Sequence, residues 1–278
     1  MKRLTLLAVT TAALLFSAGT LAAVADAAPS TLPTVTAAIT PTSIAVTGAL
    51  ESGAVNVVAQ DTGVKEGNII LVLLKPGETF EEAEAAIQKA HGDTNALDKY
   101  GSLVVDVEAT PGQSSETQAY LQPGNYVAVL PGGEGKGSKA HALFTVKAAA
   151  SPKALPAPEA TISTIEFGFR GPTTLHDGEL VRFENAGYLV HMDVAAPVKN
   201  MASAKRFVKL LLAGKEKQIE KLIVGPPVGF AGPLSPEAFQ QETITAKPGL
   251  YVQVCFMDTQ DGRSHSQLGM ERIIKIVK

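Results

Sequence analysis

The segment AKPGLYVQVC, residues 246–255, decides the fold that we expect of this chain. A Pro-Gly turn leads into an apolar-rich, alternating run, which is typical of a β-strand that begins at a turn. The segment LQPGNYVAVL, residues 121–130, has the same turn and a tyrosine at the same place. Pro123 and Pro248 lie 125 residues apart. A repeat of this length predicts a duplicated domain and not a solenoid, whose period would be shorter.

Other segments correspond at nearly the same offset. VNVVAQDTGVKEGNIILVLLKPG, residues 55–77, lines up loosely with ELVRFENAGYLVHMDVAAPVK, residues 179–199. The strands expected to close the two halves are HALFTVKA and MERIIKIVK. Many short strands separated by Gly and Pro turns favour a β-sandwich in each half. The fold class we predict is therefore mainly β, with two tandem Greek-key sandwiches.

A helical segment is expected in each half. In TFEEAEAAIQKA, Thr79 and Glu82 have the spacing of a capping box. In AKRFVKLLLAGKEKQIEKLI, Gly214 is expected to interrupt the helix. Apolar residues at helical spacing indicate one buried face in each segment. They are Phe80, Ala83, Ile87 and Ala90 in the first, and Phe207, Leu210, Leu211, Ile219, Leu222 and Ile223 in the second.

The start of the chain indicates export. Lys2 and Arg3 precede an apolar run, and Ala25-Asp26-Ala27 fits a signal-peptide cleavage site, so residues 1–27 are expected to be removed. An uncleaved membrane anchor is the second interpretation, because the run is near spanning length. No later segment is long and apolar enough to cross a membrane. We therefore predict a secreted or periplasmic protein without stable membrane insertion.

Composition divides the remaining chain. Residues 28–33 are expected to be a linker, residues 34–147 the N-terminal domain, and residues 161–278 the C-terminal domain. The Ala- and Pro-rich segment AAASPKALPAPEA, residues 148–160, is expected to join the two domains. The formal charge of −3 implies no nucleic-acid partner. The sequence gives no oligomeric state.

The single cysteine needs an explanation. Cys255 has no partner for a disulfide within the chain, and a lone thiol outside the cytoplasm is open to oxidation. Nine residues separate it from His265, and four more separate His265 from Met270. His191 is expected at the start of a strand upstream. Two histidines, a cysteine and a methionine are the ligand types of a blue-copper site.

Three segments carry a resemblance to a known family. ENAGYLVH, KPGLYVQVC and CFMDTQDGRSHSQLGM resemble the cupredoxins, the superfamily of plastocyanin and azurin. The resemblance implies two cupredoxin-like domains, with one copper ion in the C-terminal domain. It implies His191, Cys255 and His265 as ligands, Met270 as the axial thioether, and a redox partner protein.

Simpler interpretations stay open at this stage. Leu130 stands where Cys255 stands in the other half, so Cys255 is alternatively a small buried apolar residue. Met270 beside a glycine is alternatively a gap-filling residue. The segment MDTQDGRS is alternatively the tip of a β-hairpin and not part of a metal loop. If Cys255 faces inward, Gln253 faces inward too, which the sequence does not explain.

The first half is expected to be free of metal. It has Leu130 in place of the cysteine, Asn68 near the place of His191, and no methionine at ligand spacing after His141. His91 and His176 are expected to be exposed and are given no role.

Three functions remain for comparison. The first is an exported copper protein that transfers electrons or holds copper. The alternative is a metal-free extracellular module that binds another molecule or has a structural role. An enzyme is not expected, because nothing indicates an oxyanion hole or a third catalytic residue beside the thiol. Five histidines are also too few for a multicopper oxidase.

Overall fold

The chain folds mainly into β-strands, as the sequence predicts. The computed structural model describes residues 31–63, 67–109, 114–131, 138 and 140–278. The expected signal peptide, residues 1–27, lies outside these residues. Residues 32–278 form one unit. Within the described residues, no helix is long and apolar enough to span a membrane.

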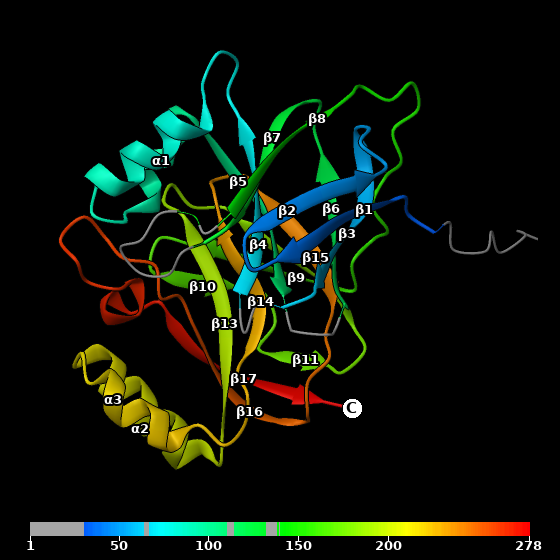
Figure 1. The fold of residues 1–278 in the computed structure, drawn as a ribbon. Helices are drawn as coiled ribbons and strands as arrows, with labels where there is room; N and C mark the ends of the chain where they lie inside the picture. The colour runs from blue at the N-terminus through cyan, green and yellow to red at the C-terminus, as the bar shows by residue number, and fades with distance from the viewer. Residues whose placement is uncertain (1–30, 64–66, 110–113, 132–137, 139) are drawn as a thin grey trace, which may run out of the picture. The chain divides into compact units, whose positions relative to one another are not determined.

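One eight-stranded sheet contains strands from both halves of the chain (Figure 1). Its order is β10 (Gly168–Arg170), β9 (Ala160–Ile165), β12 (Leu180–Asn185), β15 (Phe239–Thr243), β6 (Ser114–Leu121), β3 (Gly53–Asp61), β1 (Thr34–Thr40) and β2 (Ser43–Gly48). The β15–β6 pair, at Gln241 and Gln118, joins the two halves at the middle. Outward from this pair, the strand order of one half matches that of the other. β1 runs antiparallel to β2 and parallel to β3, and β9 runs antiparallel to β10 and parallel to β12.

Each half adds a second sheet. In the first half the order is β5 (Gly101–Ala109), β4 (Gly67–Leu74), β7 (Gly124–Leu130) and β8 (Ala140–Val146). In the second half it is β14 (Val228–Leu234), β13 (His191–Val198), β16 (Gly249–Val254), β17 (Glu271–Val277) and the short β11 (Thr174–His176). The closing strands β8 and β17 lie where the sequence predicts them.

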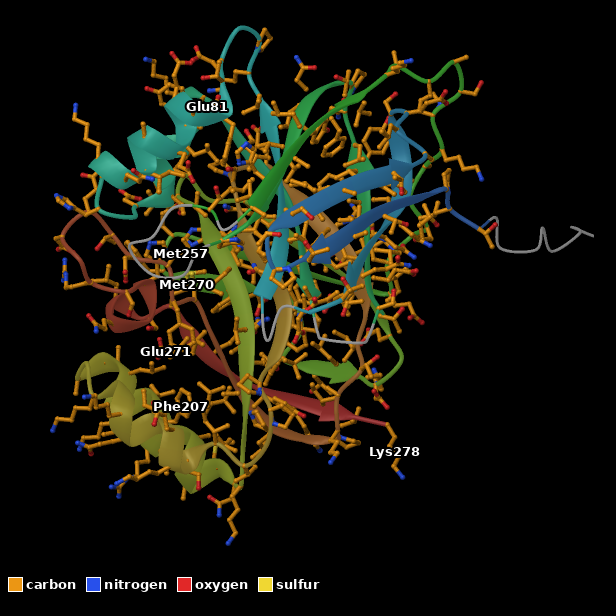
Figure 2. All side chains as sticks on the ribbon, viewed as in Figure 1. Glu81, Phe207, Met257, Met270, Glu271 and Lys278 are labelled. Atoms are coloured by element: carbon orange, nitrogen blue, oxygen red, sulfur yellow. The ribbon has the colours of Figure 1, made fainter. Side chains whose placement is uncertain are left out.

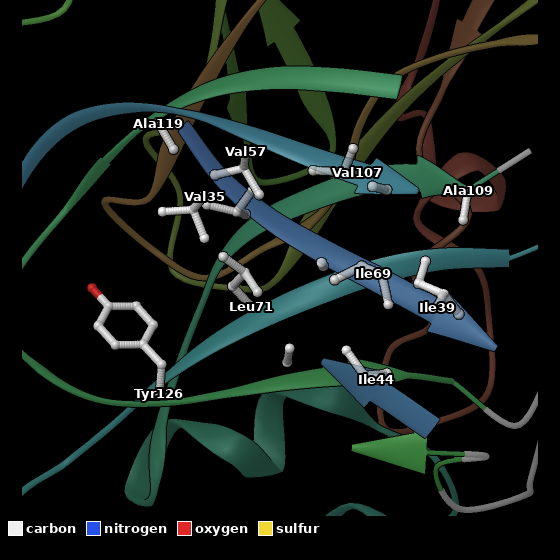
Figure 3. Close-up of a cluster of buried hydrophobic side chains, with 14 of the residues drawn as sticks. Val35, Ile39, Ile44, Val57, Ile69, Leu71, Val107, Ala109, Ala119 and Tyr126 are labelled. Atoms are coloured by element: carbon white, nitrogen blue, oxygen red, sulfur yellow. The ribbon is translucent and has the colours of Figure 1, made fainter. Parts of the chain in front are cut away.

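The core of the first half lies between its two sheets. Val35 and Val57 from the large sheet pack in one buried cluster with Ile69, Leu71 and Tyr126 from the smaller one (Figure 3). Strand β1 alternates between buried and more exposed residues, as expected of a strand with one face on a core. In the second half the rings of Phe183 and Phe230 stack with centroids 5.2 Å apart.

The predicted start of the first helix and the predicted interruption of the second are confirmed. α1 (Phe80–Lys89) has Thr79 as its N-cap, and the reciprocal capping box with Glu82 is present. α2 (Met201–Leu212) begins after Asn200, whose side chain accepts from the Ser203 N–H. Gly214, with φ of +62°, follows its end. The remaining helical segments are α3 (Glu216–Ile219) and the 3₁₀ turns η1 (Thr94–Lys99), η2 (Glu220–Leu222) and η3 (His265–Leu268).

The helices cover different sheets. Phe80 and Ala83 of α1 pack on β4 and β7, whereas Phe207 and Leu211 of α2 pack on β13 and β16. The Ala/Pro segment forms neither helix nor strand from residue 148 to residue 159, and it lies along the large sheet. The Ala54 N–H donates to the Lys153 carbonyl at 2.9 Å, and the side-chain amide of Gln241 donates to the Pro156 carbonyl.

Candidate metal centre

Neighbouring strands bring the predicted ligands to one end of the second half. His191 is the first residue of β13, and Cys255 directly follows β16. These strands are antiparallel, with Val194 opposite Val254, so the start of one lies beside the end of the other. His265 begins η3. Met270, which is labelled in Figure 2, directly precedes β17.

The long loop between Cys255 and His265 contains a hairpin tip. Asp258 and Ser264 form an isolated bridge, and the Thr259 N–H donates to the Arg263 carbonyl at 2.9 Å. The tip therefore leaves and returns at nearly the same place. A hairpin tip in this loop is therefore compatible with a position of His265 beside Cys255, because the residues between Asp258 and Ser264 form the tip and the chain then returns.

Backbone hydrogen bonds fix the return of the loop. The His265 N–H donates to the Met257 carbonyl at 2.7 Å, and the Ser266 N–H donates to the Cys255 carbonyl at 3.0 Å. The fully buried Met270 donates from its N–H to the His265 carbonyl, and its own carbonyl accepts from the Cys255 N–H at 3.3 Å. Cys255, His265 and Met270 are thus tied to one another through the main chain.

Three buried ligand atoms converge. The Nδ1 atoms of His191 and His265 are 3.1 Å apart. The Sγ atom of Cys255 is 3.5 Å from the His265 Nδ1 and 3.9 Å from the His191 Nδ1. Among the residues that the structure describes, these three form the one group of His, Cys, Asp or Glu side chains whose atoms lie close enough together to hold a metal ion.

The triangle has the size of a metal site. A point in its plane that is equidistant from the three atoms lies about 2 Å from each, close to the metal–nitrogen and metal–sulfur bond lengths of about 2.0–2.3 Å known for zinc. Two imidazole nitrogens only 3.1 Å apart also need positive charge between them, because their lone pairs repel. Either one Nδ1 carries a proton, or a cation lies between the rings. The donor set of two imidazoles and a thiolate fits copper.

Burial keeps all three groups neutral when no metal is bound. Burial and the neighbouring His265 lower the pKa of His191 to about 4, and burial also lowers the pKa of His265. Burial raises the pKa of the Cys255 thiol to about 12, although the N–H of Met192, which donates to Sγ at 3.4 Å, acts in the opposite direction. A metal ion that binds here must displace the thiol proton.

The inward-facing Gln253 has a structural explanation. Its side-chain N–H₂ donates to both carboxylate oxygens of Asp193, at 2.7 and 2.6 Å, and its side-chain oxygen accepts from the Arg272 Nε at 2.5 Å. Gln253 therefore links a buried acid to a basic residue on β17. Burial raises the pKa of Asp193 to about 7 against the opposing effects of Gln253 and Arg272.

Residues that no sequence pattern selects also border the centre. Phe167 packs edge-on against the His265 ring, with centroids 5.3 Å apart, and an oxygen of Glu166 lies 3.9 Å from the His191 Nε2. From the first half, the side-chain oxygen of Asn95 accepts from the Val190 N–H at 2.7 Å. These residues lie far from the ligands in sequence or belong to the other half, so no local motif indicates them.

The first half places different side chains at the corresponding positions. Leu130 is fully buried, and Asn68 donates to Asp106. His141 packs on Phe80, with ring centroids 4.6 Å apart. His91 and His176 are exposed, as expected from the sequence.

No protein-family model matches the chain, and no curated protein matches it. Solved structures match it weakly. Reduced auracyanin from Roseiflexus castenholzii is 18% identical, over 42% of this chain and 95% of that one, with a TM-score of 0.26. The "blue" copper protein auracyanin A from Chloroflexus aurantiacus is 15% identical over 42% and 99%, with a TM-score of 0.23. A Cu-containing nitrite reductase from Thermus scotoductus is 13% identical over 88% and 67%, with a TM-score of 0.26. Likeness at this level carries no inference about a metal or a reaction.

Proposed function

We propose that this protein binds one copper ion, which the Nδ1 atoms of His191 and His265 and the Sγ of Cys255 would hold, with the Met270 thioether as a fourth, weaker ligand. The observation that carries this proposal is the convergence of three buried ligand atoms on a point about 2 Å from each. When bound there, copper would supply reversible one-electron chemistry. The protein would serve in electron transfer or in holding copper, and not as an enzyme.

The residues of the chain prepare the site in defined ways. Backbone hydrogen bonds hold Cys255 beside His265 and Met270 before any metal arrives. The N–H of Met192 points at Sγ, which stabilises a thiolate relative to a thiol. The lowered pKa values of both histidines keep each imidazole neutral at neutral pH, so each ring has one nitrogen lone pair. A rigid, preformed set of ligands needs little rearrangement on a change of oxidation state.

Copper holding is the second candidate, and the burial of the ligands favours it. His191 is 1% exposed, and Cys255 and His265 are fully buried. The buried Val190 and the partly buried Met257, both of the second half, pack in one cluster with Phe80, Ala83 and other residues of the first half. Such a centre has no exposed ligand edge through which a redox partner could make contact.

The wider setting is part of the same proposal. We infer two tandem cupredoxin-like domains, residues 34–147 without ligands and residues 161–278 with them, exported through the signal peptide of residues 1–27. The matching strand orders of the two halves support the duplication. A redox partner protein is the partner implied if the protein transfers electrons, and no nucleic acid is expected.

Titration of the mature protein with Cu(II) tests the copper site. We expect one equivalent to produce an intense visible copper–thiolate charge-transfer band, and Cys255→Ser to abolish it. Leu130→Ala, at the corresponding position of the first half, is the matched control and should keep the band. A wild-type protein that stays colourless and binds neither Cu(II) nor Cu(I) would leave the metal-free binding module as the function.

A second measurement separates the two copper functions. Reversible one-electron voltammetry, with rapid exchange of electrons with a small redox mediator, is expected of an electron carrier. Colourless, tight binding of Cu(I), with slow exchange with the same mediator, is expected of a protein that holds copper.

A further inference from the structure

A hairpin tip of the large sheet lies against both imidazoles. Strands β9 and β10 are joined by Glu166 and Phe167, and Phe167 has a positive φ of 57°. A positive φ is unfavourable for a bulky residue and is retained where the surrounding structure requires it. This turn directs the Phe167 ring at His265 while Glu166 approaches His191. Each residue of the tip thus contacts one of the two proposed histidine ligands.

The Glu166 carboxylate is held in place by the main chain. Its Oε1 accepts from the N–H of Tyr188, and also from the N–H of Leu189 at 3.3 Å. These two main-chain donors fix the carboxylate beside the His191 ring.

The far nitrogen of His191 lacks a hydrogen-bond partner in the described part of the chain. Within the described residues, the buried Nε2 makes no hydrogen bond, and the Glu166 Oε1 lies 3.9 Å from it. That separation is too long for a direct hydrogen bond. A movement of about 1 Å by the carboxylate would bring the two atoms to hydrogen-bond distance.

Gly187 leaves the space for this approach. A Cβ atom at Gly187 would lie 2.6 Å from the Glu166 Oε1 and 2.9 Å from the His191 Nε2. Both separations are shorter than a non-bonded contact permits. Alanine at this position would therefore push the carboxylate and the ring apart, without removing either side chain.

We propose that Glu166 is a positioning residue that holds the proton of His191 on Nε2, so that its Nδ1 presents a lone pair to the centre. This proposal rests on the copper site proposed above. A neutral imidazole has one N–H and one lone pair, and a carboxylate beside one nitrogen selects the tautomer with the proton on that side. Among the described residues, His265 has no carboxylate at a comparable distance, because the Glu166 oxygen pairs with the His191 Nε2 alone. In the metal-free protein His265 therefore carries its proton on Nδ1 and donates to the His191 Nδ1 across 3.1 Å.

Imidazole tautomers in the metal-free protein provide the test. Two-bond ¹H–¹⁵N correlation spectra of the full mature chain at pH 7 should show His191 with its proton on Nε2 and His265 with its proton on Nδ1. Glu166→Gln replaces a charged acceptor by a neutral one, and Gly187→Ala displaces the carboxylate. Each variant is expected to populate the Nδ1–H tautomer of His191 and to weaken Cu(II) binding by about 10-fold or more in competition with a chelator.

Glu184→Gln is the matched control. Glu184 is a carboxylate on the neighbouring strand β12 that accepts from the Ser163 hydroxyl. Its substitution changes the net charge by the same amount and should leave the tautomers and the copper affinity unchanged. If His191 stays in the Nε2–H form in both Glu166→Gln and Gly187→Ala, the positioning role of Glu166 is wrong, even where the wild type binds copper. If the tautomers respond as expected but the wild type binds no copper, the proposed copper function fails and the effect of Glu166 on His191 stands.

Discussion

The two halves of the chain have matching strands but different side chains at one corner of the smaller sheet. This corner is where β7 or β16 ends beside the start of β4 or β13. Leu130 at the end of β7 and Cys255 after β16 are both fully buried. Near the start of β4, Asn68 donates to Asp106, whereas β13 starts with His191, which faces the thiol. The first half closes the corner with hydrocarbon and an amide–carboxylate pair. The second half closes it with three ligand atoms that converge.

The difference shows that the framework does not by itself specify the site. Both halves have matching strand orders, an inserted helix after the corresponding strand, and a tyrosine that makes the same contact. Among the described residues, the halves differ in the side chains at this end of the sheets and in the additional strand β11 of the second half. Substitution of a predicted ligand should therefore abolish metal binding without unfolding the protein. Equivalent substitutions in the strands that the halves share should lower the unfolding free energy equally in both halves.

The largest effect is expected when the second half receives the residue of the first. His191→Asn leaves two of the three converging ligand atoms, so the affinity for Cu(II) should fall at least about 100-fold, or about 3 kcal/mol. Chelator competition monitored by the visible band measures this loss. His141→Asn, which removes the histidine that packs on Phe80 in the first half, should leave the affinity unchanged. Equal losses in the two variants would place the copper elsewhere.

The second test addresses the carboxylate of the first half. Burial raises the pKa of Asp106 to about 7, with Asn68 opposing and Glu108 adding to the shift. The folded protein therefore binds a proton that the unfolded chain releases near pH 4. As a result, the free energy of unfolding falls as the pH rises through the window from about 4 to about 7, and the cost is complete above it.

Asp106→Asn should remove this pH dependence. We expect the variant to unfold with a free energy higher by on the order of 3 kcal/mol at pH 8 and by much less at pH 4, in metal-free protein. Asp193 and Glu242 also have raised pKa values and remain in the variant, so the comparison is between wild type and variant at each pH. Chemical denaturation at a series of pH values gives the measurement. A difference that is constant from pH 4 to pH 8 would contradict the assignment of the proton to Asp106.

These contrasts also mark how much the sequence predicts. The strands after the Pro-Gly turns, the capping box at Thr79 and the end of α2 before Gly214 follow from local patterns, because turn and cap chemistry act over a few residues. The structure brings together His191, Cys255 and His265, which residue type, spacing and the cupredoxin resemblance predict as ligands. That prediction needs no knowledge of the packing.

Long-range placement is what the sequence does not contain. Glu166 lies on a separate hairpin, and Asn95 lies in the other half, so their contacts with the centre depend on how strands pair across the molecule. The union of the halves through Gln241 and Gln118 depends on the same packing. The tip around Asp258 is predicted locally as a turn, but the backbone bonds that return His265 to Cys255 are formed only in the folded chain.

A smaller effect is expected from glycines at corresponding positions. Gly48 and Gly171 have φ of +104° and +100°, and a Cβ at either would lie 2.2 Å from a carbonyl oxygen, of Thr34 or Thr161. Alanine at each should cost about 2 kcal/mol of unfolding free energy, because the backbone conformation is unfavourable and the opposing oxygen belongs to the main chain. Thermal or chemical unfolding should show equal losses, with copper affinity unchanged. A loss confined to one variant would show that the frameworks are not equivalent there.

The smallest effect concerns the tyrosines that the two Pro-Gly strands share. The Tyr126 hydroxyl donates to the Gln122 carbonyl at 2.9 Å, and the Tyr251 hydroxyl donates to the Lys247 carbonyl at 2.7 Å. Tyr126→Phe and Tyr251→Phe should each lower the unfolding free energy by about 1 kcal/mol, because each leaves a carbonyl without its donor. Tyr188→Phe, at an exposed position, should change it by less than about 0.5 kcal/mol.

The double variant extends this test to the relation between the halves. Tyr126 and Tyr251 lie on different sheets and share no hydrogen-bond partner. Their losses should therefore add to within about 0.5 kcal/mol, as they do for separate sites. Burial raises the pKa of Tyr126 to about 12, so both hydroxyls keep their protons at neutral pH and the comparison is free of titration. The double variant could instead lose much more unfolding free energy than the two single losses together. That result would mean that β7 and β16 stabilise each other through the large sheet and that the two halves unfold as one cooperative unit.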